Sequence, residues 1–323
     1  MVDEDENVLD ELECPSTSSV NAVVERLSCL QSGRLPPEAI TLRDRFPDAV
    51  PEPLGAISDL NWPKLTPEDA EALSQASLIL AKRGVANAAS EPDRRLDMLS
   101  SASTELRSSW TTQESRSVEW AGLFLHDLDL DEKRAEIPSC IAKSDNISQA
   151  AIELGASVPL HMPTDSEWVA MNSQAKGVLS LSERLILNED ATRELANSHV
   201  PTLSDLIGPL GASRLIVLAG GRERLARMPS GSLQVLGASG AMAAHRRGAP
   251  PPKHSPVLFS MPLVSRSPRW VRGKIARFLA GKCSIAVRID HFGGQTWDEE
   301  KIKTIHAQAE EIRDKFPKPK KRN

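Results

Sequence analysis

Residues 272–294 read RGKIARFLAGKCSIAVRIDHFGG, and their spacing sets the fold class of the basic part of the chain. Apolar side chains recur there at helical intervals, at Ile275, Phe278, Leu279, Ile285 and Ile289. This spacing puts them on one face of an α-helix, whereas a half-buried strand would alternate at every second residue. Similar periods in the preceding segments predict several further short helices, so we expect an all-helical domain.

Six cationic side chains lie in or just before this stretch: Arg269, Arg272, Lys274, Arg277, Lys282 and Arg288. Positions 270, 274 and 277 share one helical face, and 278, 282, 285 and 289 share another, so basic and apolar faces can separate. Cations on one face contact phosphates and position nucleic acid without reading its sequence. The alternative interpretation is a basic helix that is merely solvated.

The distribution of charge along the chain favours a polyanionic partner. From residue 201 onward there are 22 Lys and Arg against 9 Asp and Glu, a balance of +13, although the whole chain carries −5. The first 200 residues hold 17 basic and 35 acidic residues. Between Gly208 and Phe292 there are 14 basic residues and only two acids, Glu223 and Asp290. Such an imbalance in one folded segment is typical of a nucleic-acid-binding surface.

Two long helical patterns precede the basic segment, at 93–128 and 165–197. Their apolar side chains follow steps of three, four and seven residues, the spacing of a narrow coiled-coil seam. We expect an antiparallel hairpin arm that dimerises, with two ordinary core helices as the alternative. The side chains expected in the dimer arm are Leu99, Leu106, Trp110, Trp120, Phe124, Trp168, Met171, Val178 and Leu185.

The start of the chain predicts a small mixed domain. Asn7–Cys14 is a candidate strand, and a helix is expected after Ser19. Another helix begins at Thr66-Pro67-Glu68, because Pro is tolerated at the first helical position and an acid is favourable near the positive end of the helix dipole.

The composition of the chain indicates the kind of cellular compartment in which the protein is expected. The four cysteines, at 14, 29, 140 and 283, lack metal-binding spacing and indicate a reducing compartment. No run approaches 18 apolar residues, and the start MVDEDENVLDE is unlike a signal peptide. We therefore expect a soluble, cytoplasmic protein without a metal site.

The stretch LQVLGASGAMAAHRRGAPPPKH at 233–254 resembles the turn of a dinucleotide-binding site. Such a site needs a buried strand before the turn, a helix of ten or more residues after it, and an acidic ribose anchor about 20 residues later. The helical stretch here ends near Arg247, before Gly-Ala-Pro-Pro-Pro, and no acid occurs between Glu223 and Asp290. A nucleotide-dependent enzyme is therefore the weaker hypothesis.

Several segments together resemble the Nop domain. They are IGPLGASRLIVLAGGRERLARMPSGSLQVLGA at 207–238, PPKH at 251–254 and the opening stretch at 272–294, with weaker likeness at 118–125 and 76–90. Taken nearly end to end, the chain is similar to the archaeal scaffold of box C/D small ribonucleoproteins. The expected fold is mainly α, with a small, incomplete α/β N-terminal domain, an antiparallel coiled-coil hairpin and an all-helical basic Nop domain.

The resemblance implies four segments with different partners. Residues 1–75 would dock fibrillarin, which uses S-adenosylmethionine to methylate ribose 2′-hydroxyls, and residues 76–200 would form the homodimeric arm. Residues 201–316 would bind guide RNA with a small kink-turn protein of ribosomal type, and 317–323 form a basic tail. The chain itself would be a non-catalytic archaeal scaffold without a cofactor, and a spliceosomal type of Nop protein is the related alternative.

Two departures from the family pattern stand out. The helix start that usually reads Gly-Ala-Glu-Lys is Gly237, Ala238, Ser239 and Gly240 here, so the expected contact with the kink-turn protein lacks a Glu–Lys pair. Family members also begin with a further apolar strand, whereas Met1 falls almost on the acidic turn that follows it. We therefore expect either that the N-terminal domain has lost this strand or that the recorded start lies downstream of the true one, and the resemblance supports binding of RNA more strongly than docking of fibrillarin.

Three further residues are expected to contact RNA, two of them with a structural alternative. Gln234 is a donor to phosphate or base, or else a cap for local backbone, and Lys253 follows a triple proline that fixes its loop. His254 is as consistent with a structural role as with RNA contact. Trp270 is expected to be buried rather than stacked on a base.

Overall fold

The computed structural model describes residues 8–12, 19–49 and 65–317, and every regular element in these ranges is a helix. The mainly α fold is therefore confirmed. No strand forms over residues 8–12, the described part of the candidate strand, so the expected α/β character of the N-terminal domain is not confirmed.

The chain divides into two compact units, and the first spans Met1–Glu91. It contains α1 (Val20–Gln31), α2 (Pro37–Arg45) and α3 (Pro67–Ala88). Helix α3 begins at Pro67 as predicted, and Thr66 caps it: its hydroxyl accepts from the Asp69 N–H, and the Asp69 carboxylate accepts from the Thr66 N–H. Helices α1 and α3 pack together and fully bury Val24 and Ala76. The expected boundary after residue 75 is wrong, because it falls inside α3.

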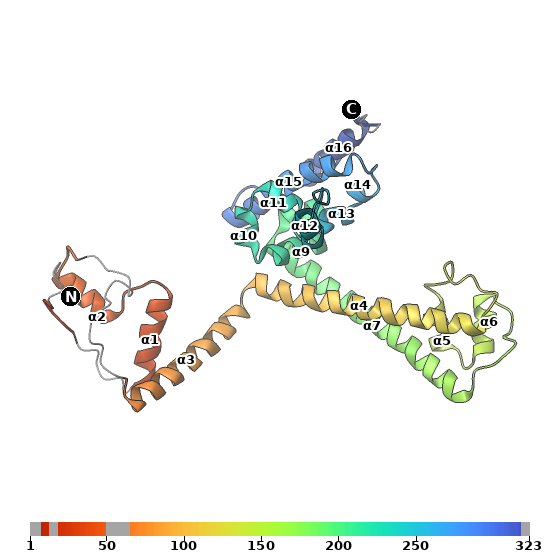
Figure 1. The fold of residues 1–323 in the computed structure, drawn as a ribbon, viewed down its shortest axis with the longest axis horizontal. Helices are drawn as coiled ribbons and strands as arrows, with labels where there is room; N and C mark the ends of the chain where they lie inside the picture. The colour runs from red at the N-terminus through yellow and green to blue at the C-terminus, as the bar shows by residue number, and fades with distance from the viewer. Residues whose placement is uncertain (1–7, 13–18, 50–64, 318–323) are drawn as a thin grey trace. The chain divides into compact units, whose positions relative to one another are not determined.

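The second unit, Pro92–Asn323, begins with the arm. Helices α4 (Pro92–Phe124) and α7 (Asp165–His199) pack side by side along the arm (Figure 1). Thr164 and Glu167 form a capping box that fixes the start of α7. The predicted helical hairpin is therefore present.

The free end of the arm, which we call the arm tip, carries α5 (Ile137–Lys143) and α6 (Ile147–Leu154). Its core joins both short helices to the adjoining ends of α4 and α7, with Val118, Ile141 and Ala175 among the buried side chains. Asn146 caps α6, and Gly155 ends it in the left-handed region at φ 75°. The arm tip is thus a small globular core built on the hairpin.

The side chains predicted for the dimer arm serve this intrachain packing. Met171, Val178 and Leu185 are buried in the hairpin. Trp120, Phe124 and Trp168 pack partly buried against the arm-tip core, and Leu99, Leu106 and Trp110 are half-buried on α4. Their apolar surface is largely covered within one chain, so a dimer would have to use other side chains as well.

Helices α8 to α16 form the basic domain that follows the arm. Their bounds are α8 Pro201–Ile207, α9 Pro209–Ala219, α10 Arg222–Arg227, α11 Ser230–Gln234, α12 Ser239–Arg246, α13 Pro256–Ser260, α14 Pro262–Ser265, α15 Arg272–Phe292 and α16 Glu299–Asp314. Long helix α15 supplies much of the core through residues such as Ile275, Leu279 and Cys283, which the other helices surround. The predicted all-helical domain is confirmed.

A polar cluster ties the arm to this domain. The Asp93 carboxylate, on the first turn of α4, lies 2.7 Å from Nε2 of His199 at the end of α7. It also accepts from the Arg222 N–H at the start of α10, at 2.8 Å. The Arg222 guanidinium in turn donates to the His199 carbonyl. Three helices therefore meet at one carboxylate.

Among the described residues no single helix is long and apolar enough to cross a membrane. Helices α8 and α9 are long and apolar enough only when they are taken together, and the chain bends by 116° between them.

Candidate nucleic-acid interface

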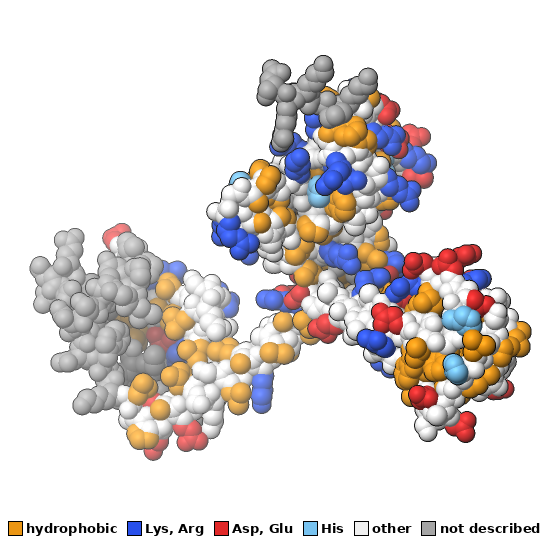
Figure 2. All heavy atoms as spheres, turned by 45° about the vertical axis from the view of Figure 1, so that its right-hand side comes forward, with side chains coloured by type: hydrophobic (Ala, Val, Ile, Leu, Met, Phe, Trp, Pro, Cys, Tyr) orange, Lys and Arg blue, Asp and Glu red, His pale blue; other side chains and the backbone are white. Residues whose placement is uncertain are grey.

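Helix α15 separates an apolar face from a basic one, but Ile285, which was expected on the apolar face, is 46% exposed. Ile275, Leu279 and Val287 are fully buried, whereas Lys274 and Arg277 are exposed. Figure 2 shows Lys and Arg side chains distributed over the visible face of the basic domain. The cations of α15 therefore have a rigid helical support.

Arg272 has a structural role that its sequence position did not reveal. Its Nε donates to the Ser267 carbonyl at 2.8 Å, and a terminal nitrogen donates to the Ser265 carbonyl at 2.9 Å. The guanidinium also lies 5.3 Å from the ring centroid of Phe259. These contacts use the guanidinium to join α13, α14 and α15, in place of the expected phosphate contact.

Two other predicted phosphate ligands are partly engaged within the fold. Arg288 is exposed, but its Nε donates to the Ala226 carbonyl at 3.0 Å and so joins α15 to α10. Lys282 is half-buried, with its ammonium 5.3 Å from the ring centroid of Phe278. Arg269, by contrast, is exposed, and no hydrogen bond is described for it in residues 65–317.

Gln234 is a buried brace rather than a surface contact. Its side chain amide donates to the Lys253 carbonyl at 2.7 Å, and its Oε1 accepts from Nε of Arg277 at 3.3 Å. The amide is also 3.4 Å from the Gly273 carbonyl. Gln234 thus fastens the loop that carries Lys253 to the start of α15, which favours the structural alternative for this residue.

The proline loop presents Lys253 and His254 in different ways. Lys253 is exposed, and its stem packs so close to α15 that a Cβ on Gly273 would lie 3.3 Å from the Lys253 Cβ. His254 is half-buried and stacks on Phe259, with 4.7 Å between ring centroids and 14° between planes. Phe259 thereby contacts both His254 and Arg272, which favours the structural alternative for His254.

These elements enclose a basic pocket of about 380 Å³ between the proline loop and α15. Its lining consists of Gln234, Pro251, Pro252, Lys253, Trp270, Gly273, Lys274 and Arg277. Trp270 is 43% exposed, so the expectation that it is buried is wrong. The basic pocket therefore combines three cations with an accessible indole.

Sequence reasoning missed Gly273 and the two prolines as parts of this site. The relevant signal was present, because a glycine at the start of a helix often marks close approach of another segment. Only the fold shows that this segment is the proline loop, about 20 residues earlier in the chain.

The Gly237–Gly240 turn lies between two short helices. Gly237 has φ 81°, and a Cβ there would lie 2.8 Å from Cδ1 of Leu218. Ala238 is buried, whereas Ser239 and Gly240 are exposed on the first turn of α12. The turn follows helix α11, and α12 has only 8 residues. The described residues thus lack the strand and the long helix that a dinucleotide site requires, which contradicts that hypothesis.

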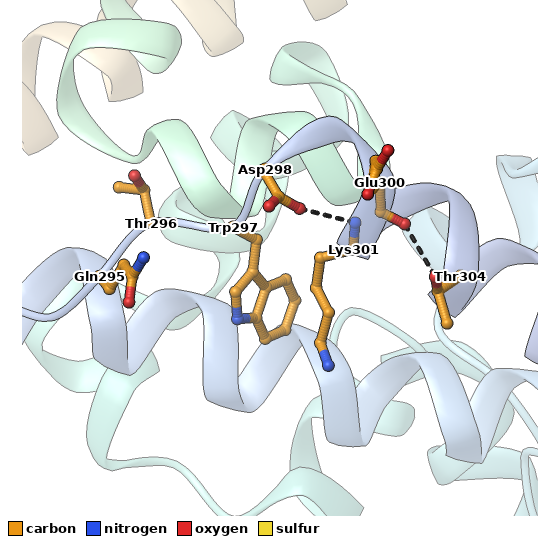
Figure 3. Close-up of a pocket in the computed structure, with 7 residues that line it drawn as sticks. All are labelled: Gln295, Thr296, Trp297, Asp298, Glu300, Lys301 and Thr304. Carbon is orange, nitrogen blue, oxygen red and sulfur yellow. Dashed lines mark hydrogen bonds between the residues drawn. The ribbon is translucent and has the colours of Figure 1, made fainter.

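A second hollow, of about 470 Å³, lies at the start of α16 (Figure 3). Asp298 accepts from the Lys301 N–H at 2.8 Å and caps the helix, and Thr304 donates to the Glu300 carbonyl. Trp297 packs against the domain core. The polar groups of this hollow form hydrogen bonds within α16, and Asp298 and Glu300 offset the charge of Lys301. This hollow therefore lacks the excess of positive charge that the basic pocket has.

Together the fold and surface define a class of mainly helical proteins in which a basic domain is carried on a long helical-hairpin arm. Residues 127–315 match the Nop family, which is described as a snoRNA binding domain, fibrillarin. The chain therefore belongs to the Nop family.

Relatives support this assignment over different lengths. An uncharacterized NOP5 family protein of Methanocaldococcus jannaschii is 32% identical over 260 residues, 74% of this chain and 62% of the relative. Nucleolar protein 56 of Schizosaccharomyces pombe is 31% identical over 171 residues, 50% of this chain and 33% of the relative. The chain thus spans less than two thirds of the length of either relative.

A solved structure titled as a fibrillarin/Nop5p complex is also similar. It has 23% identity and a TM-score of 0.44, covering 82% of this chain and 88% of that chain. The family assignment does not depend on this likeness.

Proposed function

We propose that this chain is a non-catalytic scaffold of a box C/D guide ribonucleoprotein in the cytoplasm of an archaeal cell. Its basic domain binds guide RNA beside a small kink-turn protein, and the scaffold positions fibrillarin for 2′-O-methylation of ribose in a target RNA. The observation that carries this proposal is the basic pocket, found on a domain of a family described by snoRNA binding and fibrillarin.

The chemistry of the basic pocket suits an RNA backbone. The pocket takes Lys253 from the loop that Gln234 fastens to α15, and it takes Lys274 and Arg277 from α15 itself. The backbone that carries these cations is therefore already in place before phosphate binds. The accessible indole of Trp270 offers a platform for an unpaired base. Contacts of this kind hold RNA without selecting its sequence.

Binding of a kink-turn RNA tests the RNA-binding part of the proposal. Replacing Arg269, Lys274 and Arg277 by Gln should weaken binding, and the log–log salt slope should fall by about 0.7–0.9 for each phosphate that is no longer neutralised. The measurement is fluorescence anisotropy over a salt series, with and without the kink-turn protein. The matched control removes three charges from α16, at Lys301, Lys303 and Arg313, and should keep the parent slope. Equal slopes for the two triple variants would overturn the proposal.

The Gly237–Gly240 turn is the proposed contact for the kink-turn protein. Its exposed Ser239 and Gly240 offer backbone but no charge. Changing Ser239→Glu and Gly240→Lys should tighten or preserve assembly, because charge-assisted hydrogen bonds are stronger than neutral ones. Loss of assembly in the double variant, with its helix content unchanged, would contradict the assignment.

Fibrillarin is proposed to dock on the first unit, which contains α1 to α3. The chain alone should transfer no methyl group from S-adenosylmethionine, whereas addition of fibrillarin, guide RNA and kink-turn protein should yield methylated target. Methyl transfer by the chain alone would overturn the scaffold role, and failure of fibrillarin to co-purify with the chain would overturn the docking role.

Dimerisation is proposed to use the arm tip. Six large apolar side chains there are at least half exposed: Leu123, Ile152, Val158, Leu160, Met162 and Val169. Figure 2 shows hydrophobic side chains gathered at the end of the arm. An apolar surface of this kind is typical of a protein interface.

A further inference from the structure

The turn that follows α16 contacts one side of the basic pocket. Helix α16 ends at Asp314, and the Phe316 N–H donates to the Arg313 carbonyl at 3.2 Å. The Phe316 carbonyl accepts from the indole N–H of Trp270 at 2.8 Å. The centroid of the Phe316 ring lies 3.2 Å from the Lys274 ammonium. Phe316 therefore contacts two of the residues that line the basic pocket, although it lies far from both in sequence.

Phe316 holds the Lys274 side chain in place. The Phe316 ring is half-buried and packs against the core of the basic domain, so its own position is fixed. A cation over an aromatic face is attracted by the ring quadrupole. A lysine side chain has many rotamers, and ordering it on binding a ligand costs free energy. Because the ring already restrains the Lys274 ammonium, part of that cost is met before a ligand binds.

The cations of the basic pocket are positioned by neutral partners. Gln234 bonds to the Lys253 carbonyl and accepts from Arg277, and Phe316 contacts Lys274. The ion pairs described for residues 201–317 lie on α10 and in or just after α16, and none of them includes a cation of the pocket. The charge of the basic pocket is therefore available to an anion.

The size and the walls of the basic pocket limit the anion that it can take. Its volume of about 380 Å³ is at the lower end of the ~300–1,000 Å³ usual for small-ligand sites. The accessible indole of Trp270 lies beside the cations. Bases of single strands, bulges and loops can be splayed out onto an aromatic ring, whereas the bases of a duplex stay stacked on one another. The pocket therefore suits a single unpaired nucleotide.

We propose that the basic pocket binds one unpaired nucleotide of the RNA, with the base on Trp270 and a phosphate on Lys274, and that Phe316 positions both side chains. This inference rests on the proposed function and deepens it, because it names the ligand of the pocket. Phe316 is a positioning residue, which holds the indole edge through its carbonyl and the ammonium through its ring. Trp270 and Lys274 are the contacting groups.

A fluorescent base analogue in a kink-turn RNA tests the ligand of the pocket. The analogue is 2-aminopurine, whose fluorescence falls when it stacks, and it replaces one unpaired base at a time. In the complex with the full-length parent chain, one position should be less fluorescent than in the complex with Trp270→Leu. The same analogue at paired positions is the control and should give equal signals in the two complexes.

Two substitutions at Phe316 separate its aromatic face from its packing. Phe316→Leu keeps an apolar side chain and the backbone carbonyl but removes the ring, and it should weaken RNA binding about two- to tenfold, the equivalent of ordering one long side chain. Phe316→Tyr keeps the ring and should bind as the parent does. In a Lys274→Gln background, Phe316→Leu should have no further effect, since the ring acts through the ammonium. Ile312→Val, on α16 and also packed against the core, is the matched control and should keep the parent affinity.

The outcomes separate this inference from the proposed function. Equal affinities of the parent and Phe316→Leu would overturn the positioning role. Tighter binding by Phe316→Leu would also overturn it, because the ring would then compete with phosphate for Lys274. If the parent binds RNA but no unpaired position differs in fluorescence between the parent and Trp270→Leu, the nucleotide site is overturned while RNA binding stands. Absence of RNA binding by the parent chain would overturn both.

Discussion

Arg272 and Arg269 show how neighbouring cations of one sequence motif take different roles. The guanidinium of Arg272 is occupied by two backbone carbonyls and one aromatic ring. Arg269 is exposed to solvent three residues earlier. Sequence spacing places both on the basic segment, but only the positions of α13 and α14 decide which of them is free to meet phosphate.

Replacing Arg272 by Ala should therefore destabilise the basic domain. Two hydrogen bonds from a charged donor are removed, and on the order of 2 kcal/mol of unfolding free energy should go with them. Arg269→Ala should change stability by less than about 0.5 kcal/mol. Urea denaturation followed by circular dichroism measures both, and equal stabilities would contradict the role given to Arg272.

The Asp93 carboxylate predicts a pH dependence of stability. Burial by itself would raise the pKa of Asp93, but hydrogen bonds from His199 and from the Arg222 N–H outweigh burial and lower it. A carboxyl with a lowered folded-state pKa stabilises the fold above its unfolded pKa of about 3.9. That contribution is lost as pH falls through the lower folded-state value.

Asp93→Asn should accordingly reduce the unfolding free energy at pH 7, and the gap from the parent should narrow as pH falls below about 4. Urea denaturation at pH 7, 5, 4 and 3 gives the comparison. Asp97→Asn, one helical turn along α4, is the matched control for the loss of a carboxylate from this helix. A gap that stays constant with pH would refute the linkage.

At the scale of elements, the turn before α12 combines two glycines with opposite requirements. Gly237 has φ 81° and faces Leu218 where a Cβ would lie, whereas a Cβ on Gly240 would meet nothing within 4 Å. The sequence by itself does not distinguish the conformational requirement of Gly237 from that of Gly240. The backbone angle and the neighbouring helix α9 distinguish them.

Gly237→Ala should destabilise the domain by roughly 1–2 kcal/mol, since a left-handed backbone is strained for an L side chain. Gly240→Ala should stabilise it by up to about 1 kcal/mol, because alanine favours a helix over glycine. Thermal denaturation of the two single variants measures opposite shifts of Tm. Shifts of the same sign would contradict the geometry of this turn.

At the scale of the whole molecule, the proposed dimer should depend on the arm tip. Replacing Leu160 and Val169 at the arm tip by Glu should weaken a dimer strongly, because charge on an apolar interface is costly to desolvate. Multi-angle light scattering at tens of micromolar measures the mass. Glu at Leu187 on α7, which is 70% exposed outside the arm-tip core, is the control and should leave the mass unchanged. A parent chain that is monomeric throughout would contradict the proposed dimer.

The helices could be predicted from the amino-acid sequence, because helical periodicity and capping are local properties. The run from Ile275 to Ile289, the capping Thr66 and the two long arm patterns all form helices where spacing predicted them. The excess of cations between residues 208 and 292 likewise indicated a polyanion-binding surface. None of these features depends on which segment packs against which.

Packing between distant segments determined which side chains remain available for a ligand. Gln234 became a brace and the Trp270 indole bonds to Phe316, because segments distant in sequence supply their hydrogen-bond partners. Arg272 became a brace through the Ser265 and Ser267 carbonyls, seven and five residues earlier, which the turn before α15 brings within reach. Trp120, Phe124 and Trp168 pack against a core that α5 and α6 complete, and no periodicity in the sequence placed these two helices there. Packing decides whether a side chain can reach a ligand. A guanidinium or an indole carries the same donors in every sequence, and only the fold places it against a carbonyl or in an open pocket.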